Sequence, residues 1–177
     1  AECLLEFVER DSLANQLDRF EDAFESALHR QFCRRLAIAP KTEGEDGIVH
    51  LRALMSNCYR LMKSIGMVPD QFFHDWVGGL EHESRAMRSP EQAAYQSDDF
   101  AAVRRSFEHF EATKAAPQMI ASAAFERERP ITLLYDEIEA LWAAIDRDDD
   151  WEPFQQKLAD IDTLRQATAT SLGPTML

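Results

Sequence analysis

Three alternating aspartates near the C-terminal end of the chain, Asp146, Asp148 and Asp150, could bind a hard cation such as calcium, which takes several oxygen ligands. They imitate the first three ligand positions of a calcium-binding loop. The rest of that loop does not follow, because Trp151 stands where the sharp turn needs Gly and Lys157 stands where a bidentate Glu belongs. We therefore favour a structural role, in which Asp150 caps a following helix.

A second group combines histidines with carboxylates and could bind zinc if its members converged. Its members are His74, Asp75, Glu81, His82 and Glu83. The pair Gly78-Gly79 separates the two halves and leaves their relative geometry open, and the spacing matches no HExxH signature. We favour surface histidines beside a turn, and we assign no metal ligand.

Nucleophiles and nucleotide-binding motifs are equally weak. No serine lies in a Gly-x-Ser-x-Gly motif, and no motif places a histidine beside a cysteine. Gly78-Gly79 lacks the GxxxxGK[ST] frame of a phosphate-binding loop, and Asp99-Phe100 is followed by Ala101 rather than by Gly. The residues alone therefore predict no catalytic and no cofactor-binding residue.

These residues must be positioned by helices, and the clearest signal is a helical hairpin over Tyr135 to Ile161. Its apolar residues recur at spacings of three and four: Leu134, Ile138, Leu141, Trp142 and Ile145 before the acidic turn, and Trp151, Phe154, Leu158 and Ile161 after it. A stripe at this spacing is typical of a buried helix face. We therefore expect Trp142, together with Trp76, Phe107 and Phe110, in the core rather than in a cofactor site.

Similar patterns predict further helices along the chain. In the N-terminal half we expect the end of a helix with apolar residues at positions 4, 5, 7 and 8, a long helix with a stripe from Leu13 to Leu36 behind a cap at Asp11 or Ser12, and a helix over Ile48 to Ile65 with a left-handed C-cap at Gly66. An aromatic helix follows from Pro69, with Phe72, Phe73 and Trp76, and a capping box at Ser89-Pro90-Glu91-Gln92 starts the next one. Asp98 and Asp99 open a helix that buries Phe100, Val103, Phe107 and Phe110, and a weaker helix covers Met119 to Phe125.

The fold class that follows is all-α, an irregular array of about six to eight helices with no confident strand, since no long segment alternates apolar and polar residues. We expect one helical domain over residues 1–166 and a flexible tail over residues 167–177. The chain starts at Ala1 without an initiator Met, which suggests a processed chain or an excerpt.

Composition excludes several partners and indicates a compartment. A formal charge of −13, from 32 acidic and 19 basic residues, repels nucleic acid and anionic lipid, and no stretch is long and apolar enough to span a membrane. We expect neither nucleic acid nor membrane as a partner. Three scattered cysteines, Cys3, Cys33 and Cys58, indicate reduced thiols, and no secretory signal is visible, so we expect a cytoplasmic protein.

Several blocks of the chain together resemble the C-terminal part of the selenoprotein O family, the pseudokinase-fold protein adenylyltransferases. The blocks are residues 4–36 with FEDAFESALHRQFCRRL, FFHDWVGG at 72–79, RAMRSPEQAAY at 85–95 and YDEIEALWAAIDRDDDWEPF at 135–154. The opening AECLLEF is similar to the family segment that enters this region. The blocks are packing and turn patterns rather than catalytic signatures.

The resemblance implies a full-length protein that transfers AMP from ATP to protein Ser, Thr or Tyr hydroxyls with Mg or Mn. The ATP- and metal-binding residues of the family belong to its kinase-like lobes and have no counterpart here. The redox-active Cys or selenocysteine motif of some members is also missing, because residues 171–177 contain no Cys. This segment alone is therefore expected to be inactive.

Two functions stay open. The first is an accessory helical segment that packs on the kinase-like lobes of a longer chain, and the second is an independent acidic module that binds other proteins without enzymatic activity. An excised segment should expose an apolar face, and the candidates for it are residues 1–8 and the aromatic cluster of Phe72, Phe73 and Trp76.

Overall fold

The computed structural model describes residues 9–169. Its elements in chain order are α1 (Arg10–Leu36), β1 (Ile38–Pro40), α2 (Gly44–Ile65), α3 (Pro69–Asp75), the 3₁₀ helix η2 (Gly79–His82), α4 (Glu83–Ala86), α5 (Gln92–Tyr95), the 3₁₀ helix η3 (Asp98–Phe100), α6 (Ala101–Phe107), β2 (Phe110–Ala112), α7 (Ala116–Ile120), α8 (Ala123–Glu126), α9 (Tyr135–Asp148) and α10 (Glu152–Ala169). The prediction of an all-α fold is confirmed.

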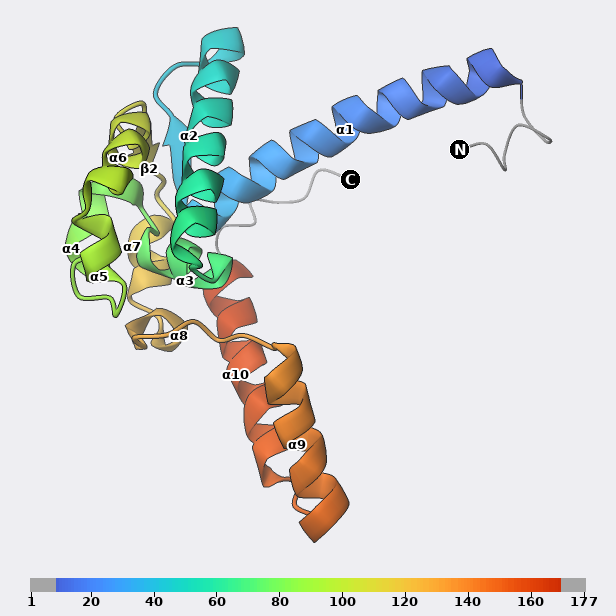
Figure 1. Ribbon diagram of the computed structural model, residues 1–177, viewed down its shortest axis with the longest axis vertical. Helices are drawn as coiled ribbons and strands as arrows, with labels where there is room; N and C mark the ends of the chain where they lie inside the picture. The colour runs from blue at the N-terminus through green and yellow to red at the C-terminus, as the bar shows by residue number, and fades with distance from the viewer. Residues whose placement is uncertain (1–8, 170–177) are drawn as a thin grey trace.

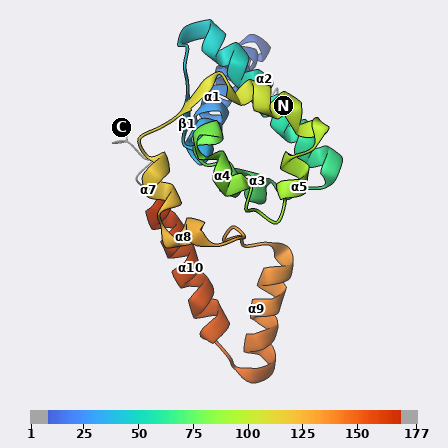
Figure 2. The same cartoon turned by 90° about the vertical axis from the view of Figure 1, so that its left-hand side faces the viewer.

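The molecule consists of a body and two helical arms (Figure 1). The body comprises α2 to α8 with the two short strands, and its short helices form a ring when viewed from the side (Figure 2). One arm is the N-terminal part of α1, which extends away from the body. The other is the hairpin of α9 and α10, which extends in a different direction and is joined to the body through α7 and α8.

The core of the body is built around Trp76, which is 1% exposed. Its ring lies 4.7 Å from the ring of Phe100 and 5.3 Å from that of Phe107, and Tyr95 meets it edge-on. Offset-stacked and edge-to-face pairs add favourable energy to the burial of these large side chains. The indole N–H of Trp76 is the one buried side-chain polar atom within residues 9–169 that lacks a hydrogen-bond partner.

This core corrects one expectation and confirms others. Phe72, Phe73 and Trp76 were candidates for an exposed docking face, but all three are buried. The expected buried face of the helix after Asp98 is confirmed, because Phe100, Val103, Phe107 and Phe110 are all buried. The other candidate docking segment, residues 1–8, lies outside the described residues.

A two-stranded antiparallel sheet joins distant parts of the body, with Ile38 paired to Ala112 and Pro40 to Phe110. Each strand has three residues, too few for an alternating pattern to be visible in the sequence. Ala37 enters β1 with φ 48° and donates its N–H to the end of α1. The sheet therefore fixes where α1 stops and where the chain returns after α6.

Several predicted helix ends hold and others move. Gly66 caps α2 in the left-handed conformation with φ 69°, as expected. α2 begins at Gly44 rather than at Ile48. The sequence predicts the later start because the first turn of this helix contains no apolar residue. The expected helix over Met119 to Phe125 is divided into α7 and α8, and the helix expected at Pro90 begins only at Gln92.

The expected stripe of α1 is present, but most of it faces solvent. Phe32 and Leu36, in the last two turns, are buried against the body. Leu17, Phe20, Phe24 and Leu28 are exposed, and Phe20 keeps 65% of its surface. Phe20 and Phe24 stack on each other at 5.9 Å, and both stay exposed among residues 9–169.

The hairpin is present as predicted, but the prediction of its burial is wrong. None of the residues of α9, every one of which the structure describes, is buried, and Trp142 is 65% exposed rather than in the core. Helical spacing indicates which side of a helix is apolar, but not whether another element covers that side.

The end of the chain also differs from the prediction. Ala167, expected at the start of a tail, is buried in α10, which continues to Ala169; residues 170–177 lie outside the described part. With Leu164, it packs against Met119 and Phe125 and anchors α10 to the body.

Candidate functional site

A buried polar cluster beneath the surface of the body is the strongest candidate for a functional site. Its centre is the last turn of α3, where Gln71, His74 and Asp75 are each about 95% or more buried. Arg85 and Ser89 approach from α4 and the turn after it, and Tyr95 approaches from α5.

Asp75 accepts hydrogen bonds from three side chains. Gln71 Nε2 donates to Oδ1 at 3.0 Å, while Ser89 Oγ and Tyr95 Oη donate to Oδ2 at 2.5 and 2.8 Å. Burial raises the pKa of Asp75, and these three donors and the nearby Arg85 oppose that rise. Burial also raises the pKa of Tyr95, as does the Asp75 charge beside it.

Arg85 connects this carboxylate to a distant segment of the chain. Its Nε donates to the carbonyl oxygen of His74 at 3.0 Å, and its Nη1 donates to the carbonyl oxygen of Phe125. Its Nη2 lies 2.6 Å from His74 Nε2. His74 Nε2 in turn lies 2.8 Å from the carbonyl oxygen of Arg127. The cluster therefore ties α3 and α4 to the residues around α8.

His74 is held in its neutral form. Burial lowers its pKa to about 4, the hydrogen bond to the carbonyl of Arg127 acts in the opposite direction, and the charge of Arg85 lowers the pKa further. Its ring also stacks on Phe125 at 5.2 Å with an angle of 10° between the planes. The interpretation of a surface histidine is therefore wrong for His74.

Two cavities flank the cluster. One, of about 370 Å³, has Asp75, Arg85, Ser89 and Arg127 in its wall. The other, of about 260 Å³, lies between the end of α1, α3 and α10, with His74, Phe73 and Leu164 in its wall. Both are half open to solvent and close to the lower end of the range of small-molecule sites.

The geometry favours structural ordering over catalysis. Asp75 already accepts three hydrogen bonds, so its carboxylate has little capacity left to act as a general base. Ser89 Oγ donates to that carboxylate instead of to a histidine, which leaves it without the base that activates a serine nucleophile. The N–H groups of Arg85 are engaged with the backbone carbonyls of His74 and Phe125 and with the ring of His74.

The residues that were weighed as zinc ligands and not assigned as such are dispersed. Glu81 accepts the backbone N–H of Ala112, Glu83 pairs with Arg104, and the ring of His82 lies against Gly78, where an added Cβ would come within 2.3 Å of it. Gly78 also has φ 81°, which glycine adopts without strain. Across the described range 9–169, no group of three or more His, Cys, Asp or Glu side chains could hold a metal ion.

The acidic turn follows the capping interpretation. Asp150 Oδ1 accepts the backbone N–H of Glu152 at 3.0 Å, at the start of α10, and Asp149 takes the left-handed conformation with φ 50°. The indole N–H of Trp151 donates to Asp149 Oδ1 at 2.9 Å. Asp146 and Asp148 are exposed on the last turn of α9.

Sequence reasoning identified His74 and Asp75 but missed their partners. Ser89 was recognised only as a helix cap; it does accept the N–H of Glu91, but its own proton goes to Asp75. Arg85 and Tyr95 lie in the block at 85–95 that carries the family resemblance, but their spacing gave neither a role, because single charged or aromatic residues of short helices fit a solvent face equally well. A motif could not have revealed contacts that span 40 residues between Arg85 and Phe125 and 53 residues between His74 and Arg127.

Cysteines and long helices add nothing to this site. Cys33 is half-buried and Cys58 is buried, both as free thiols, and burial raises the pKa of Cys33 to about 11. Cys3 lies outside the described residues. Within residues 9–169, no helix is long and apolar enough to cross a membrane.

These features define a class of structure, namely an irregular helical unit with a closed core, a buried polar cluster and two exposed arms. They do not by themselves identify the family of the protein. The family model described as protein adenylyltransferase SelO matches residues 1–162. The chain therefore belongs to the SelO family of protein adenylyltransferases. The comparisons with curated proteins and with solved structures give no match.

Proposed function

We propose that this chain is a non-catalytic helical segment of a SelO-family adenylyltransferase and that it packs on the kinase-like lobes of that protein. The proposal goes beyond family membership, because it assigns this segment a supporting role. The observation that carries it is the apolar surface of α1, which the body leaves uncovered.

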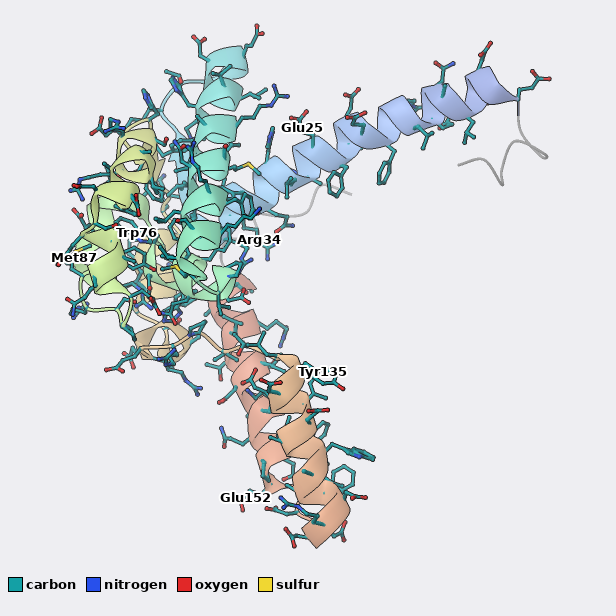
Figure 3. All side chains as sticks on the ribbon, in the orientation of Figure 1. Glu25, Arg34, Trp76, Met87, Tyr135 and Glu152 are labelled. Atoms are coloured by element: carbon teal, nitrogen blue, oxygen red, sulfur yellow. The ribbon has the colours of Figure 1, made fainter. Side chains whose placement is uncertain are left out.

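The N-terminal part of α1 needs a partner to be stable. Helical spacing places Leu17, Phe20, Phe24 and Leu28 on one side of α1, and all four are exposed. This part of α1 extends away from the body (Figure 3). Most of the stability of a helix in a protein comes from the packing of its apolar face, and a contiguous apolar patch typically marks an interaction site. A catalytic lobe of the same protein would cover this face and keep α1 helical.

The chemistry of the described residues supports the absence of catalysis by this segment alone. Of the carboxylates considered for catalysis or zinc, Asp75 accepts hydrogen bonds from Ser89 and Tyr95, Glu83 pairs with Arg104, and Glu81 accepts the backbone N–H of Ala112. The family implies ATP and Mg or Mn for the full-length protein. In the range 9–169, no group of three or more His, Cys, Asp or Glu side chains could hold the metal ion.

A direct test is incubation of these 177 residues with labelled ATP, Mg or Mn, and a protein substrate, beside a full-length family member as the positive control. We expect AMP incorporation only in the control. Label transferred by the 177 residues alone would refute the non-catalytic role.

The docking role has its own test. The kinase-like portion of the protein, produced separately, should bind this chain, and Phe20→Asp with Phe24→Asp should abolish that binding without changing the core. Tyr59→Asp, at another exposed aromatic residue on α2, is the matched control and should bind normally.

The body also has a closed core of its own, which favours a second candidate, an acidic protein-interaction module without an enzymatic parent. The gene discriminates between the two functions. A kinase-like coding region upstream in the same frame supports the first, and an independent reading frame supports the second.

A further inference from the structure

The α9–α10 hairpin presents an apolar surface that the body does not use. Helical spacing places Tyr135, Ile138 and Trp142 on one side of α9. All three are exposed, as are Trp151, the residue before α10, and Leu158 of α10. We call these five residues the hairpin surface. Tyr135, labelled in Figure 3, stands at the base of this arm.

Aromatic side chains bury about 150–250 Å² each when they are fully covered, so a partner that covers Tyr135 and Trp142 gains a large favourable burial. Its edges on α9 are acidic, because Glu139 and Asp146 follow the apolar stripe on the same side of the helix and are exposed. The surface therefore combines an apolar centre with a negatively charged rim.

The charge of this arm is concentrated in one segment. Residues 135–152 hold eight acidic residues and one arginine, which gives −7 of the formal net charge of −13. The turn itself contributes Asp146, Asp148, Asp149 and Asp150 with Arg147, all of them exposed. Like charges within a Debye length, about 8 Å at physiological salt, repel one another, so a positively charged partner is stabilised there.

We propose that the hairpin surface binds a basic amphipathic helix of another protein segment, with apolar residues on the centre and Lys or Arg on the acidic rim. A second copy of the chain would bring the same negative charge, and an anionic membrane would be repelled for the same reason. A helix laid on an apolar face is a common recognition mode, and charge at the rim sets its selectivity. This assignment does not depend on whether the segment transfers AMP.

The test uses the whole 177-residue chain and three synthetic 18-residue peptides. One is an amphipathic helix of Leu and Lys, one replaces each Lys by Glu, and one keeps the Lys residues but scrambles the apolar face. Trp142 and Trp151 report binding through their fluorescence, while Trp76 is buried and insensitive. We expect a spectral shift and saturable binding with the Leu/Lys peptide alone, weakened about tenfold by a rise from 50 to 300 mM salt.

Variants locate the contact. Ile138→Asp should weaken binding about tenfold or more, because it puts a charge in the apolar centre. Replacing Asp146, Asp148 and Asp149 by Asn should remove the salt dependence, and Asn tolerates the left-handed conformation of Asp149. Asp150 is kept because it caps α10. Phe24→Asp on α1, an equally exposed apolar position, should leave binding unchanged.

Helical content by circular dichroism shows whether each variant is folded, and Trp142→Ser provides a second variant of the apolar centre if Ile138→Asp unfolds α9. Equal binding of the Glu peptide would overturn the proposal. So would a loss of binding in Phe24→Asp but not in the hairpin variants, or no binding of the Leu/Lys peptide at all.

Discussion

In the body, α6 packs against α2 and buries Val103 and Phe107 almost completely, whereas α9 turns an equally regular stripe toward solvent. Both helices have apolar residues at spacings of three and four. The difference lies in what surrounds them. Elements of the body converge on Trp76, while no residue of α9 is buried by the part of the chain that the structure describes.

The body and the two arms are therefore stabilised in different ways. The core of the body is satisfied within the chain, so its helices can be as short as four residues and still be held. The arms consist of long helices whose apolar faces the body leaves exposed, so a partner that covers those faces stabilises them. Each of the following predictions tests that division.

The largest expected effect is at the centre of the body. Trp76→Ala should lower the free energy of unfolding by about 3–5 kcal/mol, because it leaves a cavity among Phe72, Phe100 and Phe107. Urea denaturation followed by circular dichroism measures the loss.

Trp142→Ala is the matched substitution in the arm, and it should change the same free energy by no more than about 0.5 kcal/mol. Equal losses for the two tryptophans would mean that the hairpin is covered in solution, and the contrast between body and arm would be wrong.

The next effect is at the polar cluster. Asp75→Ala should cost about 3 kcal/mol, because Ser89 and Tyr95 would keep buried donors without their acceptor and Arg85 would lose its nearby negative charge. Denaturation of the variant measures this cost. Asp136→Ala, at an exposed carboxylate of α9, is the control and should stay within about 0.5 kcal/mol of the parent. A similar cost at both positions would show that the polar cluster does not stabilise the fold.

These two sites show what the sequence can and cannot indicate. Periodicity located the apolar sides of α1, α2, α6, α9 and α10, because a helix places every third or fourth residue on one side. It could not distinguish Trp76 from Trp142, since burial depends on elements distant in sequence. In Trp76, those elements are α5, η3 and α6.

The candidate site was predictable only in part, for the same reason. From the sequence, His74 and Asp75 indicate either zinc ligands or surface residues beside a turn. What decides their role is the approach of Arg85, Ser89 and Tyr95, which lie 10 to 21 positions away. No local pattern encodes such contacts, whereas the cap at Asp150 is local and was predicted.

A smaller effect concerns pH and again separates the two regions. The folded pKa of His74 is about 4, against 6.5 for an ordinary histidine, so the unfolded chain binds more protons between these values. The stability contribution of neutral His74 is thus complete above pH 6.5 and is lost as the pH falls toward 4. We expect a loss of about 2 kcal/mol, which allows for residual solvent near the ring.

Urea titrations from pH 4 to pH 8 measure this dependence. The variant His74→Gln isolates it, because Asp75, whose raised pKa acts in the opposite direction, is present in both proteins. The variant should show a flatter profile between pH 6.5 and 4. Parallel profiles for the two proteins would show that His74 is not buried in its neutral form.

The smallest expected effect is confined to the hairpin arm. Asp150→Ala removes the acceptor for the N–H of Glu152 and should destabilise the start of α10 by about 1 kcal/mol. Since α10 is anchored to the body at its other end by Leu164 and Ala167, the loss should appear as local opening rather than as global unfolding. Amide hydrogen exchange should therefore accelerate at Glu152 and its neighbours while the amides of α2 and α6 keep their protection. Asp148→Ala, on the same turn, should leave exchange at Glu152 unchanged; faster exchange across α2 as well would mean that the arm and the body unfold as one unit.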